Sequence, residues 1–511
     1  MNRRRFLARS LGAGSTAMAR RTLGAGAFVA LTAGGSRPAA AADPAYPIDR
    51  LRGAVDAGDI AVLLPGQPDY RRYQRYAAAN ARVARQPAVR ILIRTSAGAA
   101  AAVNWARDNS VPFAVRGGGH CYEDFSQSAE VVLDLRPMAD VTIAADRASV
   151  SVGGGALLGQ VYAALAEIDR VVPAGSCPQV GAAGHVLGGG YGLFARKFGL
   201  ACDSLIGAEI VDAQGRVLTV NDSAEPDLFW ALRGAGSGSF GVVTRLDYRT
   251  SALEFGTRFT IDWGANGELG IDDAIPVLRA WQAWAPTAPP EMGPILRIHE
   301  RRGNVNLHCF GISTNIDKSW VRAQLARLAD VTDGQIGTPV TQSCGDLVRH
   351  FSGGSTLTAD LDDTDFFARR YYKGKSDVIT QPITAAGARA LLRAVVDTGT
   401  VNAICDPYGG AIASVAADET AFPHRGGTLF TIQYYAEWEN AAETADRLAD
   451  LARVHAAMRP HASGGAYFNY CDIDLPDPAK AYWGVNLARL RAVKRAYDPA
   501  NLFRHAQSIA P

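Results

Sequence analysis

The chain has 511 residues, of which 48% are hydrophobic and 20% are charged, a composition typical of globular proteins and a length sufficient for two domains. The formal net charge is +2, but residues 1–42 hold seven arginines and no acidic residue, which leaves about −5 on the remainder. A mildly acidic chain lacks the basic surface that nucleic-acid binding requires, so we expect no nucleic-acid partner.

The first 42 residues are predicted to be a signal peptide rather than part of the fold. Residues 2–7 are close to a twin-arginine signal, a weakly apolar stretch follows over 23–33, and four alanines at 39–42 form a small-residue cleavage site. The apolar stretch is too short to span a bilayer, so we expect no membrane association. The prediction is a secreted protein, exported already folded by the twin-arginine machinery; the alternative is a basic N-terminal tail without a fold.

A βαβ unit is predicted over residues 89–115. Strands at 89–93 and 111–115 flank an alanine-rich helix that Ser96 caps and that ends at Asp108. A short crossover of this kind makes the two strands parallel and neighbouring. The second strand leads into Arg116–His120, where three glycines precede a histidine. This loop is therefore expected at the carboxyl end of a parallel strand, where ligands commonly bind.

A second glycine loop follows at Cys177–Gly192, with six glycines and one cysteine in sixteen residues. Glycine allows a backbone to approach a flat or phosphorylated ligand closely, because no Cβ intervenes. Two such loops, one with an imidazole and one with a thiol, predict a large cofactor held from two sides. Around them we expect strands at 131–135, 141–144, 149–152 and 241–248, helices at 156–165 and 226–233, and a hairpin of 208–212 with 216–220.

The pattern changes after residue 251. Strands at 258–263, 295–300, 304–312 and 428–438 alternate with helices at 274–285, 318–329 and 385–396, and a last helix is expected at 486–495. This is typical of an α+β domain with an antiparallel sheet. The seven cysteines are an odd number and cannot all pair internally. Neither CxxC nor HExxH occurs, so we predict no metal site.

Eight motifs together resemble the berberine-bridge-enzyme-like oxidases of the vanillyl-alcohol-oxidase flavoprotein superfamily. They run in the family's order: Val115–His120, Cys177–Gly192, Asp227–Gly234, Gly236–Thr244, Phe422–Arg425, Ile432–Tyr434, Tyr467–Asp472 and Asn501–His505. The resemblance implies an α+β fold with a two-part, PCMH-type FAD-binding domain, formed by residues 43–253 and completed by a C-terminal segment, 461–511. Residues 254–460 would form a substrate domain whose antiparallel sheet is flanked by helices.

The resemblance also implies a bicovalent FAD, bonded to His120 through the flavin 8α-methyl group and to Cys177 through flavin C6. Thiolates and neutral imidazoles are the side chains that can attack an electrophilic ring, and backbone N–H groups of glycine loops can cradle a pyrophosphate. Cys121, next to His120, is expected to be a bystander. The other expected cofactor contacts are Arg116, Gly117, Gly118, Gly119, Val180, Gly181, Gly184, His185, Gly188, Gly189, Gly190, Gly192, Gly241, Val242, Tyr467 and Asn469.

By the same resemblance, Tyr470 is the expected base that deprotonates a substrate hydroxyl, with Tyr467 as a substrate contact. A free phenol has a pKa of about 10, so Tyr470 needs a partner to share its proton. Tyr408 or a polar residue of the strand that carries Thr431 and Gln433 is the candidate, because these two alternate with Ile432 and share one face. Relatives that close alkaloid rings use a glutamate base, which neither Thr431 nor Gln433 supplies.

The expected reaction is oxidation of a hydroxyl group of a sugar, or of a glycosylated or polycyclic secondary metabolite, with O₂ as acceptor and H₂O₂ as product. Val180 lies three residues after Cys177, where the family has valine in oxidases and leucine in several dehydrogenases. Trp281, Trp284 and the pair Tyr371–Tyr372 either stack on sugar rings or pack in the substrate-domain core. The alternatives are a flavin dehydrogenase with another acceptor, an oxidative cyclase, and a flavin-binding protein without turnover.

Overall fold

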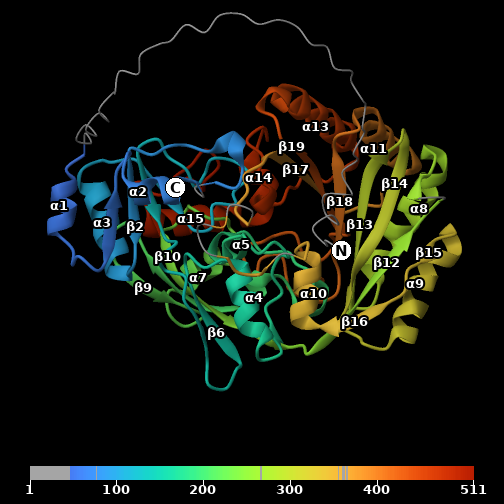
Figure 1. Ribbon diagram of the computed structural model, residues 1–511, viewed down its shortest axis with the longest axis horizontal. Helices are drawn as coiled ribbons and strands as arrows, with labels where there is room; N and C mark the ends of the chain where they lie inside the picture. The colour runs from blue at the N-terminus through green and yellow to red at the C-terminus, as the bar shows by residue number, and fades with distance from the viewer. Residues whose placement is uncertain (1–45, 76–77, 265–266, 355, 360–362, 364–365) are drawn as a thin grey trace, which may run out of the picture.

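The computed structural model describes residues 46–75, 78–264, 267–354, 356–359, 363 and 366–511. The predicted signal peptide, residues 1–42, lies outside them. Three β-sheets of four, five and eight strands form the body of the molecule, and helices pack against them (Figure 1). The predicted α+β class is confirmed.

The four-stranded sheet has the order β1-β2-β4-β3. Its strands are β1 (Ile60–Leu63), β2 (Val89–Ile93), β4 (Val131–Asp134) and β3 (Phe113–Arg116). The predicted βαβ unit is present, with α3 (Ser96–Asp108) capped by Thr95 and not by Ser96. The expectation that β2 and β3 are neighbours was wrong, because β4 lies between them and is parallel to both. All of β4 is buried whereas β3 is mostly half-buried, so β4 takes the inner position and β3 the edge.

The five-stranded sheet is antiparallel, in the order β5-β6-β10-β8-β9. Its strands are β5 (Val141–Ile143), β6 (Ser149–Gly153), β10 (Val242–Arg249), β8 (Leu205–Val211) and β9 (Val217–Val220). The hairpin of β8 and β9 is the predicted one. Helices α4 (Leu158–Ala166), α5 (Ala182–Leu187) and α7 (Pro226–Leu232) contribute buried residues to the core shared with this sheet.

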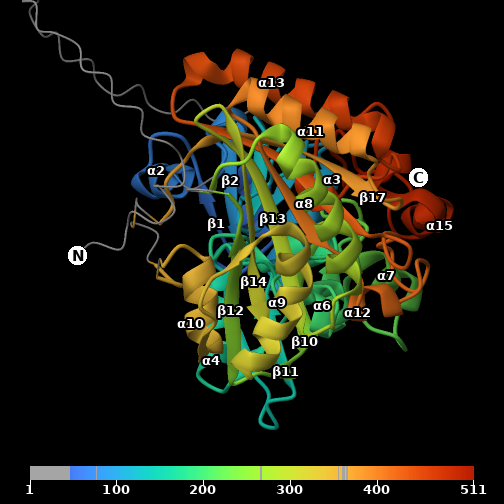
Figure 2. The same cartoon turned by 90° about the vertical axis from the view of Figure 1, so that its right-hand side faces the viewer.

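The eight-stranded sheet is antiparallel throughout and runs β15-β12-β14-β13-β18-β19-β17, with β16 paired to β12. Its long strands are β12 (Phe255–Asp262), β13 (Met292–Arg301), β14 (Asn304–Ser313), β17 (Tyr371–Ile379), β18 (Asn402–Pro407) and β19 (Phe430–Trp438); β15 is Gln335–Ile336 and β16 is Val340–Ser343. Helices cover one face (Figure 2): α8 (Ile271–Trp284), α9 (Lys318–Thr332), α11 (Ala385–Thr398) and α13 (Thr444–Met458).

The C-terminal residues pack into the cores of the two smaller sheets. The chain passes a short helical turn, η9 (Phe468–Tyr470), and then forms α14 (Pro478–Trp483) and α15 (Leu487–Tyr497). Residues between 466 and 509 share a core with the five-stranded sheet, and Phe503 packs with the four-stranded one. The Trp483 indole N–H also donates to the carbonyl of Ala235, at 2.8 Å. The Tyr467–Asp472 motif is thereby placed between the smaller sheets and β17.

Candidate active site

The two glycine loops predicted from the sequence touch each other. A Cβ added to Gly118 would lie 2.3 Å from the backbone nitrogen of Gly181, and one added to Gly181 would lie 2.5 Å from that of Gly118. Real Cβ atoms do not approach so closely, so glycine is required at both positions. This contact brings His120 and Cys177, which the two loops carry, to the same region of the molecule.

The start of α4 holds the cysteine-bearing loop in place. The N–H of Leu158 donates to the carbonyl of Val180 at 2.8 Å, and the N–H of Gly159 donates to that of Pro178 at 3.0 Å. His185, on α5, accepts a hydrogen bond at Nε2 from the N–H of Gly175, at 2.9 Å. The imidazole of His185 is therefore a support for the loop.

Cys177 and Gly184 border an open space, which we call the hollow. Both are exposed, although most of their neighbours are buried, and a Cβ added to Gly184 would meet no atom within 4 Å. The surrounding protein nevertheless raises the pKa of the Cys177 thiol by burial. Cys177 and Gly184 therefore form one wall of this hollow. The open space at Gly184 leaves room for a flat cofactor such as FAD.

His120 lies beside this wall as a neutral imidazole. Burial lowers its pKa to about 4, and burial together with the nearby His120 lowers the pKa of His185 to a similar value. The ring of His120 lies 6.3 Å from that of Tyr372. Burial raises the pKa of Tyr372 well above its ordinary value, and the nearby Tyr122 raises it further. Tyr372 is therefore a neutral aromatic neighbour of His120.

Tyr467 has a different position from the expected one. Its hydroxyl accepts hydrogen bonds from the backbone N–H groups of Gly190 (3.0 Å) and Tyr191 (2.9 Å), and one from the side-chain amide of Asn469 (2.9 Å). Asn469 also donates to the carbonyl of His185, at 2.8 Å. With its oxygen occupied and its side chain buried, Tyr467 supports the glycine loop, and its contact with a substrate stays a prediction.

Several glycines of the second loop pack against protein instead of facing the hollow. A Cβ at Gly188 would lie 2.0 Å from the amide oxygen of Asn469, and one at Gly192 would lie 1.9 Å from the carbonyl of Ala174. Gly189 and Gly190 have φ values of +107° and +82°, a conformation that favours glycine. These four residues shape the loop, because protein atoms fill the space where their side chains would lie.

Three other expected cofactor contacts, Arg116, Gly241 and Val242, pack against other parts of the protein. The guanidinium of Arg116 is fully buried in an ion pair with Asp134, at 2.5 Å. Gly241 packs against the carbonyl of Val211, and the side chain of Val242 is buried in the core under the four-stranded sheet. Their role as cofactor contacts stays a prediction, for which their backbone atoms are the accessible part.

Tyr470 donates a hydrogen bond to Asp406 at 3.1 Å, and this carboxylate is the partner that the sequence reasoning missed. Burial raises the pKa of Asp406 to about 7, while the hydrogen bond from Tyr470 acts in the opposite direction. Burial and the charge of Asp406 raise the pKa of Tyr470 well above its ordinary value. The expected partner, Tyr408, instead stacks on Tyr191, with ring centroids 5.8 Å apart. Asp406 lies two residues before Tyr408, but nothing in the local sequence marks its side chain as buried.

Tyr122 is a second residue that the sequence reasoning missed. Its ring stacks on that of Tyr470 at 6.0 Å, and its hydroxyl accepts a hydrogen bond from the Gln433 amide at 2.7 Å. Gln433 therefore reaches the site through Tyr122, from the sheet face opposite the helices. Gly374, on β17, makes room for this ring, because a Cβ there would lie 2.5 Å from it. The position of Tyr122, two residues after His120, is the signal that could have revealed it.

Of the aromatic residues considered for sugar stacking, only Tyr372 lies at the site. Trp281 is fully buried against Phe430, and Tyr371 stacks on Trp438 in the core of the eight-stranded sheet. Trp284 packs against the same core.

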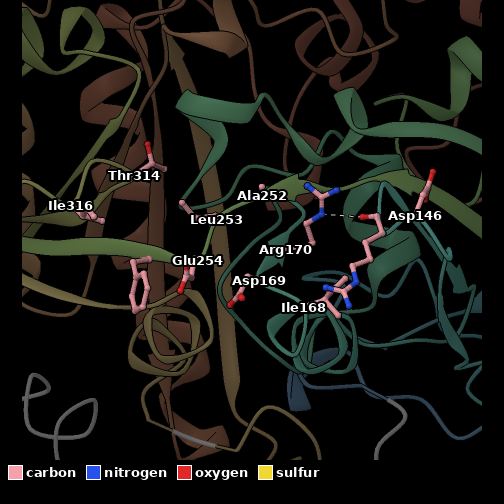
Figure 3. Close-up of a pocket in the computed structure, with 11 residues that line it drawn as sticks. Asp146, Ile168, Asp169, Arg170, Ala252, Leu253, Glu254, Thr314 and Ile316 are labelled. Atoms are coloured by element: carbon pink, nitrogen blue, oxygen red, sulfur yellow. Dashed lines mark hydrogen bonds between the residues drawn. The ribbon is translucent and has the colours of Figure 1, made fainter.

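A separate hollow of about 620 Å³ is lined by residues 146–147, 168–170 and 252–255, with Thr314 and Ile316 (Figure 3). The guanidinium of Arg170 donates to the carbonyl of Arg147 there, at 3.0 Å. None of its lining residues belongs to the glycine loops or to the Tyr470 group. We therefore place the candidate active site at the glycine loops.

Within the described part of the chain, no helix combines the length and the apolar character needed to cross a membrane.

Comparison with known proteins agrees with this arrangement. Residues 87–221 match the family model of the FAD binding domain, and residues 466–510 match that of berberine and berberine-like proteins. An uncharacterized FAD-linked oxidoreductase of Bacillus subtilis, YvdP, is 31% identical over 88% of this chain and 98% of its own. The monolignol oxidoreductase AtBBE-like 13 of Arabidopsis thaliana is 31% identical over 80% of this chain and 81% of its own.

The fold matches a solved structure over nearly its whole length. Physcomitrella patens BBE-like 1 superimposes with a TM-score of 0.80 at 29% identity, over 90% of this chain and 98% of that protein. The motifs, the meeting of the two glycine loops and these matches together show that the chain is an FAD-dependent oxidoreductase of the berberine-bridge-enzyme-like family.

Proposed function

We propose that the protein is a secreted oxidase that uses bicovalent FAD to oxidise a hydroxyl group of a sugar, or of a glycosylated or polycyclic secondary metabolite. The observation that carries this proposal is the hydrogen bond from Tyr470 to the buried Asp406. It supplies a base for an O–H bond close to the hollow on which Cys177 lies. Bound FAD would supply the hydride acceptor for the carbon that bears the hydroxyl, with O₂ as the final electron acceptor and H₂O₂ as the product.

His120 and Cys177 are the attachment residues in this proposal. The imidazole is neutral above about pH 4 and so keeps a lone pair for bond formation. The thiol lies on the open wall of the hollow, where a ring can reach it. A cofactor held by two covalent bonds needs no lid to retain it, which leaves the hollow open for a bulky substrate.

Tyr470 acts together with Asp406 in this mechanism. Because the pKa of Tyr470 is raised, its resting form is the protonated phenol, which is not itself a base. The carboxylate of Asp406, with a pKa of about 7, can take the phenolic proton as the phenolic oxygen takes the proton of the substrate hydroxyl. The pair thus moves one proton from substrate to Asp406 without forming a free phenolate.

Tyr122 positions this pair, because it is fixed by Gln433 and stacks on one face of the Tyr470 ring. Tyr467 instead positions the glycine loop, through its hydrogen bond to the N–H of Gly190. Val180, half-buried beside Cys177, is the residue proposed to leave room for O₂ at the flavin. The name of the monolignol oxidoreductase, a relative at 31% identity, agrees with oxidation of an alcohol.

The experiment that tests the proposal is peptide mass spectrometry of the purified protein, followed by a substrate screen. We expect one FAD that bridges the peptides of His120 and Cys177. In the screen, a sugar or glycosylated metabolite should bleach the oxidised flavin without air, and readmitted air should restore the colour and produce H₂O₂. Bleaching without reoxidation by air would show a dehydrogenase instead. Export is tested separately by fusing residues 1–42 to a reporter and replacing Arg3 and Arg4 with lysine, which should abolish export.

A further inference from the structure

Two cysteines of the site lie in contact and have no part in the proposed reaction. The Sγ atoms of Cys121 and Cys471 are 3.7 Å apart, although 350 residues separate them in sequence. Cys121 directly follows His120, and Cys471 directly follows Tyr470. Cys121 is half-buried and Cys471 is buried. The sulfur pair therefore joins the loop that carries one flavin attachment residue to the turn that carries the base.

A buried group of charges holds these two segments together. The ammonium of Lys373, on β17, contacts the carboxylate of Glu123 at 2.5 Å and that of Asp472 at 2.8 Å. Glu123 lies two residues after Cys121, and Asp472 is the residue after Cys471. Lys375 makes a further contact to Asp472, at 2.8 Å. Because both segments are tied to one strand, the two sulfur atoms are held near each other.

The two thiols are not equivalent. The hydrogen bond between them lowers the pKa of Cys121 and raises that of Cys471. Cys121 is also the more exposed of the two. A thiolate that a small oxidant can reach is the reactive form of cysteine, so Cys121 is the sulfur that would be oxidised first.

We propose that Cys121 and Cys471 form a redox cross-link site, a dithiol in the reduced protein and a disulfide after reaction with a peroxide. The Cys121 thiolate attacks one peroxide oxygen, the O–O bond breaks, and a sulfenic acid and one water form after proton uptake. The Cys471 thiol then attacks the sulfenic sulfur and releases the second water. Two thiols are oxidised by two electrons, and one H₂O₂ is reduced to two H₂O.

The geometry allows the bond to form with little movement. A disulfide has an S–S distance of about 2.05 Å, so the two sulfur atoms, which are 3.7 Å apart, must approach by less than about 2 Å. A bond between residues so far apart in sequence restricts the unfolded chain strongly. We therefore expect the oxidised protein to be the more thermostable form, with its flavin loop and base turn covalently joined.

The test treats purified FAD-loaded protein with one equivalent of added H₂O₂, removes the excess with catalase, and alkylates free thiols with N-ethylmaleimide in denaturant. Unreduced digests should then contain a peptide that joins Cys121 to Cys471 and is two hydrogens lighter than its parts. The melting temperature should rise by a few degrees on oxidation and return with dithiothreitol. Cys121→Ser and Cys471→Ser should each abolish both effects. Cys309→Ala, which removes a buried thiol of β14, should abolish neither.

The proposal is overturned if both cysteines stay fully alkylated after peroxide treatment of folded protein. It is also overturned if Cys121 is recovered as a sulfinic acid or joined to Cys177. Because the peroxide is added, these results do not depend on whether the protein is an oxidase. Failure of the proposed function would appear separately, as the absence of H₂O₂ with every substrate. Retention of FAD in the Cys121→Ser and Cys471→Ser variants, read from the visible spectrum, confirms that each has folded.

Discussion

Replacing Asp406 with asparagine tests the pairing with Tyr470 most directly. The asparagine would keep the size of the side chain and could still accept the hydrogen bond, which measures 3.1 Å in the structure. It could not take the phenolic proton. Loss of a general base costs about a hundredfold or more in turnover, so we expect Asp406→Asn to lower kcat by at least that factor while FAD stays bound.

The pH dependence of turnover is an independent check on the role of Asp406 as proton acceptor. With a pKa of about 7, Asp406 is ionised in only about one tenth of the molecules at pH 6, so the rate there should be roughly tenfold below its plateau above pH 8. The rate should rise with pH, because the ionised carboxylate is the active form. In Asp406→Asn, the residual rate should lose this rise near pH 7.

The raised pKa of Asp406 also predicts that the Asp406→Asn variant is more stable than the parent protein at high pH. The folded-state pKa of Asp406 lies above the ordinary value of 3.8, so the folded protein holds this proton more tightly than the unfolded chain does. The corresponding stability is complete below about pH 3.8 and is lost as the pH rises through 7, by roughly 4 kcal/mol in all. An asparagine has no proton to lose, so Asp406→Asn should melt at a higher temperature than the parent at pH 8, and the difference should shrink towards pH 4.5.

Stopped-flow flavin reduction and thermal melts across pH 4.5 to 9 measure both effects. The single result that would refute the reasoning is an Asp406→Asn enzyme with near-parental turnover and an unchanged pH profile. A slow variant that is also less stable at pH 8 would show that Asp406 is needed for structure and not as a proton acceptor.

Four further substitutions probe the remaining roles. Tyr470→Phe should keep the flavin and lower turnover by about a hundredfold or more; near-normal turnover would remove this residue from the mechanism. Tyr467→Phe leaves two backbone N–H groups without their acceptor, at a cost of about 1–3 kcal/mol, so we expect a lower melting temperature and incomplete flavin loading. Gly184→Ala should fold but lose FAD, since only the cofactor would meet the new methyl group. The control Gly53→Ala, at another helical glycine with open space around it, should keep FAD. Equal FAD loading in both variants would show that the flavin does not lie at Gly184. Val180→Leu should slow reoxidation of the flavin by O₂ more than its reduction. Stopped-flow traces in which both half-reactions are unchanged would contradict the role of Val180 in oxygen access.

The sequence was sufficient for most elements with a clear local pattern. Alternating and helical periodicities located the hairpin of β8 and β9, the helix α3 and the strands β12, β13, β14 and β19, but they did not locate β17, β18 or α13. Glycine density located both loops, because a backbone that must approach a ligand or another backbone leaves its mark in composition. The ordered motifs identified the family and so the cofactor.

The tertiary structure alone decided which side chains face each other. Tyr470 and Asp406 are 64 residues apart, and only the packing of η9 against the end of β18 brings them together in a buried place that shifts their pKa values. Position in a motif suggested Tyr467 as a substrate contact, but its hydroxyl is turned to the backbone of the glycine loop. The insertion of β4 between β2 and β3 likewise follows from which strand is buried on both faces. Local periodicity is set by neighbours along the chain, whereas proton sharing depends on contacts between residues distant in sequence, which form only when the sheets and the C-terminal segment pack.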